Sequence, residues 1–222
     1  MESVPSVVQE ILIWALPVLF AITFHEVAHG WAARALGDPT AHQLGRLSLN
    51  PLSHVDPVGS VVVPLITYLS AHMLFGWAKP VPVSARNFQN PRRDMAIVAM
   101  AGPLSNLAMA LVWGLLLKWA LIMPADQGID AGMRLMSMAG IEINLWLMVL
   151  NLLPIPPLDG SRVLAGMLPE QGARQFARLE PYGLFILLGL IGLHLLGPIL
   201  GPPFAVSRAL ISGLLGLHDS AS

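Results

Sequence analysis

The chain has 222 residues, of which 55% are hydrophobic and 11% charged, whereas an average soluble domain carries roughly 25% charged residues. That composition excludes an exterior that faces water everywhere, so we expect an integral protein of the lipid bilayer, and the net charge of −1 gives no reason to expect a nucleic-acid partner. Cysteine is absent, which excludes disulfides and cysteine-ligated zinc and leaves His, Asp or Glu as the ligands of any bound metal.

Five apolar stretches predict an all-α polytopic membrane protein, because about 20 apolar residues span a bilayer. The first stretch has no basic residue ahead of it, so we do not expect a cleaved signal peptide. The fifth breaks at Gly197-Pro198 and again at Gly201-Pro202-Pro203, which predicts one span plus a shorter helix. We expect a single domain over residues 1–222, with a core at about 7–165 and C-terminal helices at about 181–217. The stretches are 7–36, 58–77, 95–123, 136–153 and 182–217.

The segment after the first stretch is short, polar and rich in turn-forming residues. Gly37-Asp38-Pro39 ends the first helix. Residues 40–49 alternate in character around Gly45, which predicts a small β-hairpin.

The basic residues indicate which ends of the stretches lie in the cytoplasm. If residues 58–77 enter the membrane and return on the same side, nine of the 12 basic residues lie on one side; a full crossing would divide them. We therefore expect a re-entrant segment, an outer N-terminus and an active site toward the cytoplasm. The nine are Arg34, Arg46, Lys79, Arg86, Arg92, Arg93, Arg162, Arg174 and Arg178.

The motif His25-Glu26-Val27-Ala28-His29 lies within the first apolar stretch. Positions i and i+4 share one face of a helix, so both imidazoles can reach one metal ion. Glu26 then lies beside the ion, where its carboxylate can accept a proton from water whose pKa zinc lowers. The alternative is a pair of histidines on a polar surface. Two histidines and a glutamate in an apolar helix are unfavourable unless they have a function, so we favour the catalytic interpretation.

A catalytic zinc ion usually has three protein ligands and a water molecule, so His25 and His29 need a third ligand. The best candidate is Asp159, near the end of the run NLLPIPPLDG at residues 151–160. The prolines stop the fourth helix and predict an extended stretch that aims the carboxylate inward, while Gly160 allows a close turn. The alternative is a solvated aspartate in a loop that ends a helix.

Five motifs follow one another between about residues 20 and 165. They are HEVAH at 25–29, NPLSHVDPVGS at 50–60, GWAKPVP at 76–82, AGPLSN at 101–106 and NLLPIPPLDG at 151–160. In this order they resemble the site-2 protease family of intramembrane zinc metalloproteases, in a small bacterial-type form without the PDZ domain that some members insert. The combination is more specific than any single motif.

This resemblance implies one Zn²⁺ per chain, held by His25, His29 and Asp159, with Glu26 as the catalytic base. It implies a core of three helices, from the first, third and fourth stretches, with the second entering from the cytoplasmic side. Many members of the family trim membrane-anchored regulators after another protease has removed an outer domain. We therefore expect membrane-spanning protein substrates and a place in a bacterial or archaeal cell membrane.

Three further residues are candidates for the site. Asn106, after Gly102-Pro103, is expected either to bond a substrate backbone or oxyanion or to bond between helices. For Asn151 we expect a role in holding the substrate strand or in supporting the metal ligands. His54 is expected to reach the metal, to bond one of its ligands, or only to cap a turn.

Two other functions have to be weighed against proteolysis. In a metal-ion carrier, intramembrane His and Asp side chains would bind the permeating ion. Glu26 argues against this function, because a carrier needs no base beside the HxxxH pair. An inactive scaffold is the other alternative, and the presence of both histidines, Glu26 and Asp159 argues against it.

Overall fold

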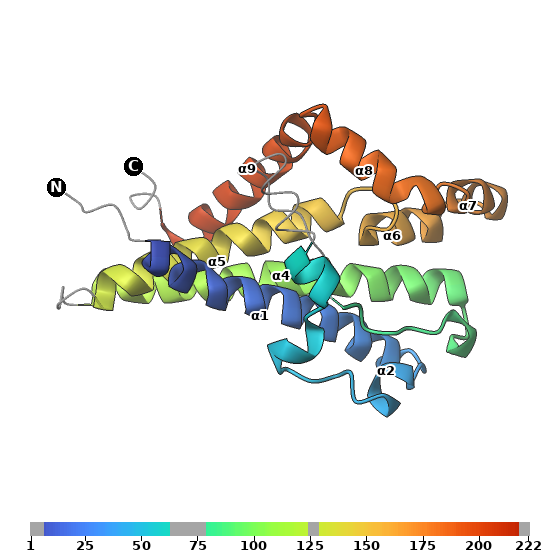
Figure 1. The fold of residues 1–222 in the computed structure, drawn as a ribbon, viewed down its shortest axis with the longest axis horizontal. Helices are drawn as coiled ribbons and strands as arrows, with labels where there is room; N and C mark the ends of the chain where they lie inside the picture. The colour runs from blue at the N-terminus through green and yellow to red at the C-terminus, as the bar shows by residue number, and fades with distance from the viewer. Residues whose placement is uncertain (1–6, 63–78, 124–128, 218–222) are drawn as a thin grey trace.

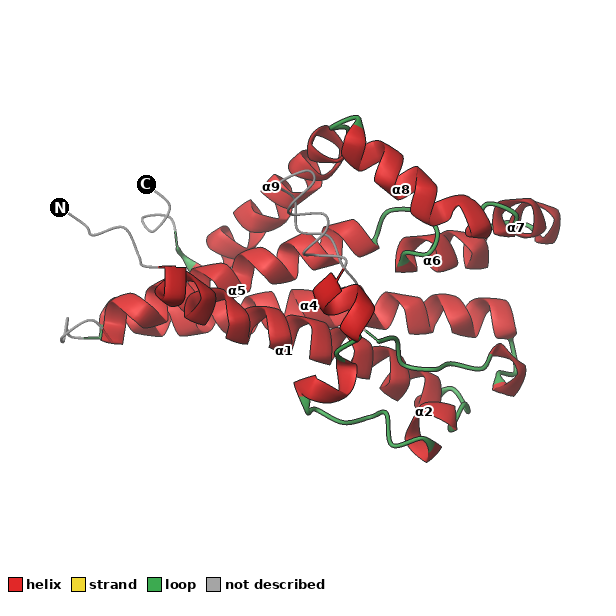
Figure 2. Cartoon of the chain, in the orientation of Figure 1, coloured by secondary structure: helices red, strands yellow, loops and turns green. Residues whose placement is uncertain are grey.

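A computed structural model describes residues 7–62, 79–123 and 129–217, and within these ranges every regular element is helical (Figure 2). Three long helices form the centre of the molecule: α1 (Val7–Ala35), α4 (Pro91–Ile122) and α5 (Ile129–Asn151). Helices α1 and α5 run in the same direction and α4 runs against them (Figure 1). The all-α class and the three-helix core expected from the sequence are confirmed.

Four helices in the described ranges are long and apolar enough to cross a bilayer, namely the three central helices and α9 (Leu196–Leu215). Only 17% to 39% of the spanning window of each helix is buried inside the protein, so most of these apolar surfaces face lipid. The chain is therefore an integral membrane protein.

The largest buried cluster lies where α9 packs against α4 and α5. The ring of Phe204 on α9 stacks on Trp146 of α5, with ring centroids 4.3 Å apart. Gly114 of α4 lies against Leu215, and a side chain at this glycine would place its Cβ 2.3 Å from a leucine methyl group. Helix α9 is thus packed onto the core, on two of its three helices.

The short elements are α2 (Thr40–Gln43), η1 (Pro51–His54), η2 (Val58–Val62), η3 (Ala85–Asn87), α6 (Asp159–Met167), α7 (Glu170–Ala177), η4 (Glu180–Tyr182) and α8 (Gly183–Gly192). Several short elements, among them α2 and α7, lie toward the end of the core where α1 ends and α4 begins, and α8 runs back from there toward α9 (Figure 1). The nine basic residues that we expected on one side fall at the end of α1, at the start of α4, in α6 and α7, or in the connections next to these elements. The re-entrant segment expected at 58–77 falls largely outside the described residues and stays a prediction.

The β-hairpin predicted at residues 40–49 is wrong, because this segment starts with the short helix α2. Gly45 has a φ of +65° and follows the helix. Its N–H donates to the carbonyl of His42, and the N–H of Arg46 donates to the carbonyl of Ala41 at 2.8 Å. This pair of bonds is a Schellman motif, in which a left-handed glycine ends a helix. The glycine that suggested a hairpin is therefore a helix terminator.

The break in the fifth apolar stretch lies at residues 193–195 and not at the Gly-Pro pairs, so this detail of the prediction was wrong. Helix α8 ends at Gly192, and His194 adopts a φ of +56° before α9 begins at Leu196. Pro198 falls in the first turn of α9, where its missing N–H has no helical partner in any case. Pro202 and Pro203 lie inside the helix, as prolines can in transmembrane helices.

Asp38, just after α1, connects the segment that follows α1 to the segment that precedes α4. Its carboxylate accepts hydrogen bonds from the Thr40 N–H (3.1 Å) and hydroxyl (2.5 Å), from the Ser84 N–H (2.7 Å) and from Asn87 Nδ2 (2.7 Å). The residue has no exposed surface. Burial raises the pKa of this carboxyl, but the hydrogen bonds outweigh burial and hold the pKa below its ordinary 3.8.

We expect Asp38→Asn to lower the free energy of unfolding at neutral pH by about 1.5–3 kcal/mol, the contribution typical of hydrogen bonds to a charged group. Because the folded-state pKa is depressed, the carboxylate stabilises the fold above the ordinary pKa, and this stability is lost as the pH falls through the folded pKa. The difference in melting temperature between wild type and variant should therefore shrink as detergent-solubilised protein is taken from pH 7 into acid. A difference that stays constant with pH would contradict this role.

Candidate metal centre

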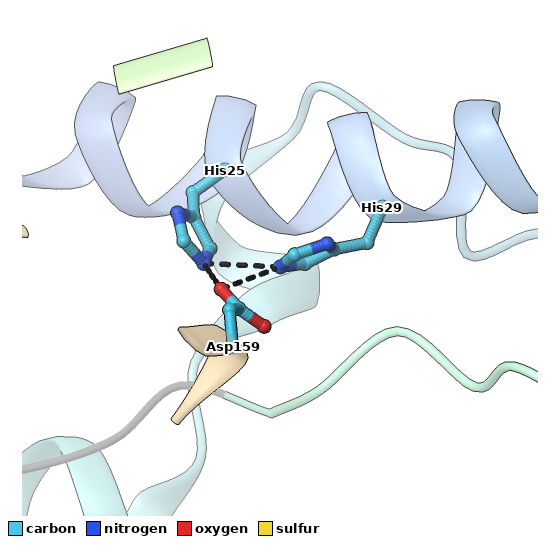
Figure 3. Close-up of side chains that lie close together, drawn as sticks. All are labelled: His25, His29 and Asp159. Atoms are coloured by element: carbon cyan, nitrogen blue, oxygen red, sulfur yellow. Dashed lines mark hydrogen bonds and ion pairs between the residues drawn. The ribbon is translucent and has the colours of Figure 1, made fainter. Parts of the chain in front are cut away.

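The imidazoles of His25 and His29 project from one face of α1, one helical turn apart. Their Nε2 atoms are 3.1 Å apart and the rings meet edge to face, with centroids separated by 4.7 Å. Asp159 reaches the same point from the start of α6, with its Oδ2 atom 3.1 Å from His25 Nε2 and 3.3 Å from His29 Nε2 (Figure 3). Residues 130 positions apart in the chain thus converge on one point.

The loop before Asp159 positions the carboxylate through turns and a close helix contact. Residues 152–158 form turns and not the extended stretch that the prolines suggested; for example, the N–H of Leu158 donates to the carbonyl of Ile155 at 2.9 Å. Gly160 lies against the end of α5, where a Cβ atom would lie 2.2 Å from the carbonyl oxygen of Leu152. Only a glycine fits this contact, which holds the start of α6 against the end of α5.

The hydrogen bonds of the two imidazoles fix which ring nitrogen carries the proton. His29 Nδ1 lies 2.8 Å from the carbonyl oxygen of Val98, which can only accept, so Nδ1 is the donor. His25 Nδ1 lies 2.7 Å from Asn106 Oδ1, and the Asn106 NH₂ group donates elsewhere, to the carbonyl of Ala21 at 3.2 Å. His25 Nδ1 is therefore a donor too. In the neutral state both Nε2 atoms are lone-pair acceptors.

With both imidazoles neutral, three acceptors meet at one point without a proton between them, an arrangement that a bound metal cation would stabilise. The Asp159 Oδ2 atom is buried and accepts no hydrogen bond within the described residues. Ligand atoms bonded to one tetrahedral zinc ion at about 2.0–2.2 Å lie about 3.3–3.6 Å from one another. The separations of 3.1 to 3.3 Å seen here are close to that. Two imidazoles and a carboxylate are a donor set that suits zinc, so the residues present fit this ion.

Glu26 lies one residue after His25 and is held by a segment distant in the chain. Its Oε2 atom accepts a hydrogen bond of 2.8 Å from the N–H of Val81. Pro80 and Pro82 flank Val81 and have no N–H, so the N–H of Val81 is the backbone donor that residues 80–82 offer. Within the described residues the second carboxylate oxygen accepts no hydrogen bond, which leaves it available for a proton.

Gly102 brings the backbone of α4 into contact with both histidines. A Cβ atom at this position would lie 2.5 Å from Nε2 and Cε1 of His29 and 2.6 Å from Cε1 of His25. These distances are far shorter than van der Waals contacts between carbon atoms. The glycine therefore leaves the space that the two imidazoles occupy.

The structure places Asn106 in contact with His25, whereas the hydrogen bonds of the two other candidates go to other residues. Asn106 is fully buried and both hydrogens of its NH₂ group are engaged, with Ala21 and Asn144, so it bonds between helices as one of our two alternatives proposed. Asn151 donates to the carbonyl of Leu147 on its own helix at 2.9 Å. A role for Asn151 in substrate binding stays a prediction.

His54 is also buried, at the end of the short helix η1. Its Nε2 donates to the carbonyl of Ser48 at 2.8 Å, and its own carbonyl accepts from the N–H of Lys79 at 2.9 Å. It does not belong to the group of His25, His29 and Asp159. The contacts connect the loop after α2 to the segment that holds Glu26, and any further role of His54 stays a prediction.

Asn144 of α5 was not among the residues predicted from the sequence. It is fully buried and accepts a hydrogen bond of 3.0 Å from Asn106 Nδ2. An asparagine inside a helix long enough to span the bilayer is the signal that could have found it.

Comparison with known proteins agrees with this site. No family profile and no solved structure matches the sequence. The protein named "Putative zinc metalloprotease YwhC", from Bacillus subtilis, is 36% identical over 191 residues, which cover 83% of this chain and 84% of that protein. This chain belongs to the site-2 protease family. A second site-2 protease relative, "Putative zinc metalloprotease Rip2" of Mycolicibacterium smegmatis, is 30% identical over 78% of this chain and 64% of its own length.

Family membership settles the general chemistry. As a site-2 protease relative, the chain is a membrane-embedded metalloprotease whose cofactor is zinc. An archaeal relative, "Putative zinc metalloprotease MJ0611" of Methanocaldococcus jannaschii, is 39% identical over 67 residues, or 30% of this chain.

Proposed function

We propose that the chain is an intramembrane endopeptidase, with His25, His29 and Asp159 as the ligands of one zinc ion and Glu26 as the catalytic base. The observation that carries the proposal is the convergence of three proposed ligand atoms, 3.1 to 3.3 Å apart. Two of them belong to α1, a helix that can span the bilayer. Glu26 next to the ligands favours hydrolysis over ion transport, because a transported ion needs no proton acceptor beside it.

The chemistry divides between the metal and the residues of the chain. Zinc, when bound, acts as a Lewis acid that makes water a nucleophile near neutral pH. Glu26 accepts the proton of the attacking water and returns it to the leaving amine. The N–H of Val81 fixes one oxygen of the Glu26 carboxylate and leaves the other oxygen to carry that proton. Asp159 and the two imidazoles fix the position at which hydrolysis takes place.

The depth of the site supports substrates that lie in the membrane. His25 is ten residues before the end of α1 at Ala35, which is about 15 Å along a helix, within the ~30 Å hydrocarbon core. We propose that the basic end is cytoplasmic, by the positive-inside rule, and that the site opens toward it. A helical substrate has its backbone hydrogen bonds satisfied internally, so it must unwind locally before it is cut.

The proposal can be tested with single-span substrates and purified protein in liposomes. We expect product masses to place the cut inside the hydrophobic segment, in its cytoplasmic half, with faster cleavage when a Gly-Pro pair weakens the substrate helix. If the chain takes part in regulated intramembrane proteolysis, substrates without their outer domain should be cut faster than intact ones. Cleavage confined to water-exposed loops would contradict an intramembrane reaction, and zinc binding without cleavage of any substrate would favour a carrier or a scaffold.

A further inference from the structure

A series of hydrogen-bonded, buried polar side chains connects the three central helices and ends at His25, one of the proposed metal ligands. Asn144 Nδ2 donates to the carbonyl of Gly140 at 2.8 Å, and Asn144 Oδ1 accepts from Asn106 Nδ2 at 3.0 Å. Asn106 Oδ1 in turn meets His25 Nδ1 at 2.7 Å. Asn144 and Asn106 have no exposed surface, so water does not compete for these bonds.

Two backbone carbonyls fix the donor and the acceptor of every hydrogen bond in this series of side chains. The oxygen of Gly140 can only accept, so the Asn144 group that faces it is the NH₂ and the group that faces Asn106 is the oxygen. The oxygen of Ala21 likewise requires the NH₂ group of Asn106 on its side, at 3.2 Å. Both constraints turn the carbonyl oxygen of Asn106 toward His25.

We propose that Asn144 is a positioning residue that locks His25 in the tautomer with the proton on Nδ1. If the Asn106 amide flipped, its NH₂ group would face His25 Nδ1, which would then have to accept, and the ring proton would move to Nε2. A protonated Nε2 cannot bind a metal ion, because the lone pair is used. Of the two acceptors that prevent this flip, Asn144 is the closer, at 3.0 Å against 3.2 Å for Ala21.

The substitution Asn144→Leu tests the lock, because leucine has a similar size and cannot accept a hydrogen bond. In metal-free protein labelled with ¹⁵N-histidine, the ring ¹⁵N shifts distinguish protonated from bare nitrogens, and the signals of His25 are identified by their loss in His25→Ala. We expect wild type to carry the proton on Nδ1 alone. In Asn144→Leu only the longer bond to Ala21 still opposes the flip, so the Nε2–H form should appear beside the Nδ1–H form. Zinc affinity, measured by competition with a chelator, should fall about tenfold or more, as when the hydrogen-bond partner of a ligand is lost.

Two further variants separate positioning from a general effect on folding. Asn144→Asp keeps an acceptor for Asn106, so it should retain the wild-type tautomer and affinity. Ser137→Ala, at another buried polar position on α5, should leave both unchanged. An unaltered His25 tautomer in Asn144→Leu, whether or not affinity falls, would overturn the proposal.

The inference rests on the proposed metal site only for its affinity measurement. The tautomer is read in metal-free protein, and zinc binding that survives His25→Ala would show instead that the metal site is wrong.

Discussion

Replacing Glu26 with glutamine should reduce peptide hydrolysis by about 10²- to 10⁴-fold, the usual contribution of a general base, while one zinc ion per chain remains bound. Glutamine has the shape of glutamate, and its side-chain oxygen can still accept the N–H of Val81 that now bonds to Glu26 at 2.8 Å. It cannot take up a proton from water at neutral pH. The three proposed ligands are unchanged, so the cleavage rate should fall while the zinc content stays the same. The measurement is the cleavage rate together with elemental analysis of the same preparation.

The matched control for this change is Glu10→Gln, the same substitution on the same helix near its N-terminal end. Glu10 is exposed in the first turn of α1, about 22 Å along the helix from His25. Its variant should cleave at the wild-type rate. Equal cleavage by wild type and Glu26→Gln would remove Glu26 from the mechanism.

Gly102→Ala should weaken zinc binding by about 10- to 100-fold and slow hydrolysis by about 10²-fold, the effect of misplacing a reacting group by about 1 Å. The added methyl group would lie 2.5 Å from the imidazole of His29 and 2.6 Å from that of His25. Either the two rings or the backbone of α4 must move. Both rings also bond through Nδ1 to α4 itself, at Asn106 and Val98, so they cannot move away from this helix without losing a hydrogen bond.

A glycine elsewhere in the bundle provides the control for this second change. Gly132 lies in the spanning helix α5 and has nothing within 4 Å of an added Cβ atom. Gly132→Ala should keep wild-type affinity and rate, and it should be at least as stable, because alanine favours helix more than glycine does. Undiminished zinc affinity in Gly102→Ala would show that the ligands are not packed against this glycine.

The convergence of His25, His29 and Asp159 could be predicted from the sequence, because few residues of the chain can bind a metal and two of them lie in one short motif. HEVAH places two imidazoles on one helical face whatever the rest of the fold does. The absence of cysteine and the scarcity of acidic residues in the apolar segments left Asp159 as the best third ligand. The helices themselves follow from apolar stretches long enough to span a bilayer.

The predictions that failed depended on context that a linear pattern does not contain. Gly45 suits a hairpin or a helix end equally well, and the bonds from residues 45 and 46 back into α2 decide the matter. The fifth stretch breaks at His194 and not at its prolines, which a spanning helix accommodates. Asn144 and Asp38 each also bond a distant residue, 38 positions away for Asn144 and 46 for Asp38, so their roles appear only once the chain is folded.

The most direct test of the metal centre is to remove zinc from purified protein and then restore it, with zinc per chain and cleavage rate measured on the same samples. We predict one zinc ion per wild-type chain, loss of cleavage in proportion to zinc removed, and full recovery when one equivalent is returned. His29→Ala and Asp159→Ala, prepared in parallel, should bind no stoichiometric zinc. Cleavage that persists after zinc has been removed, or variants that retain a full equivalent, would contradict a zinc centre formed by His25, His29 and Asp159.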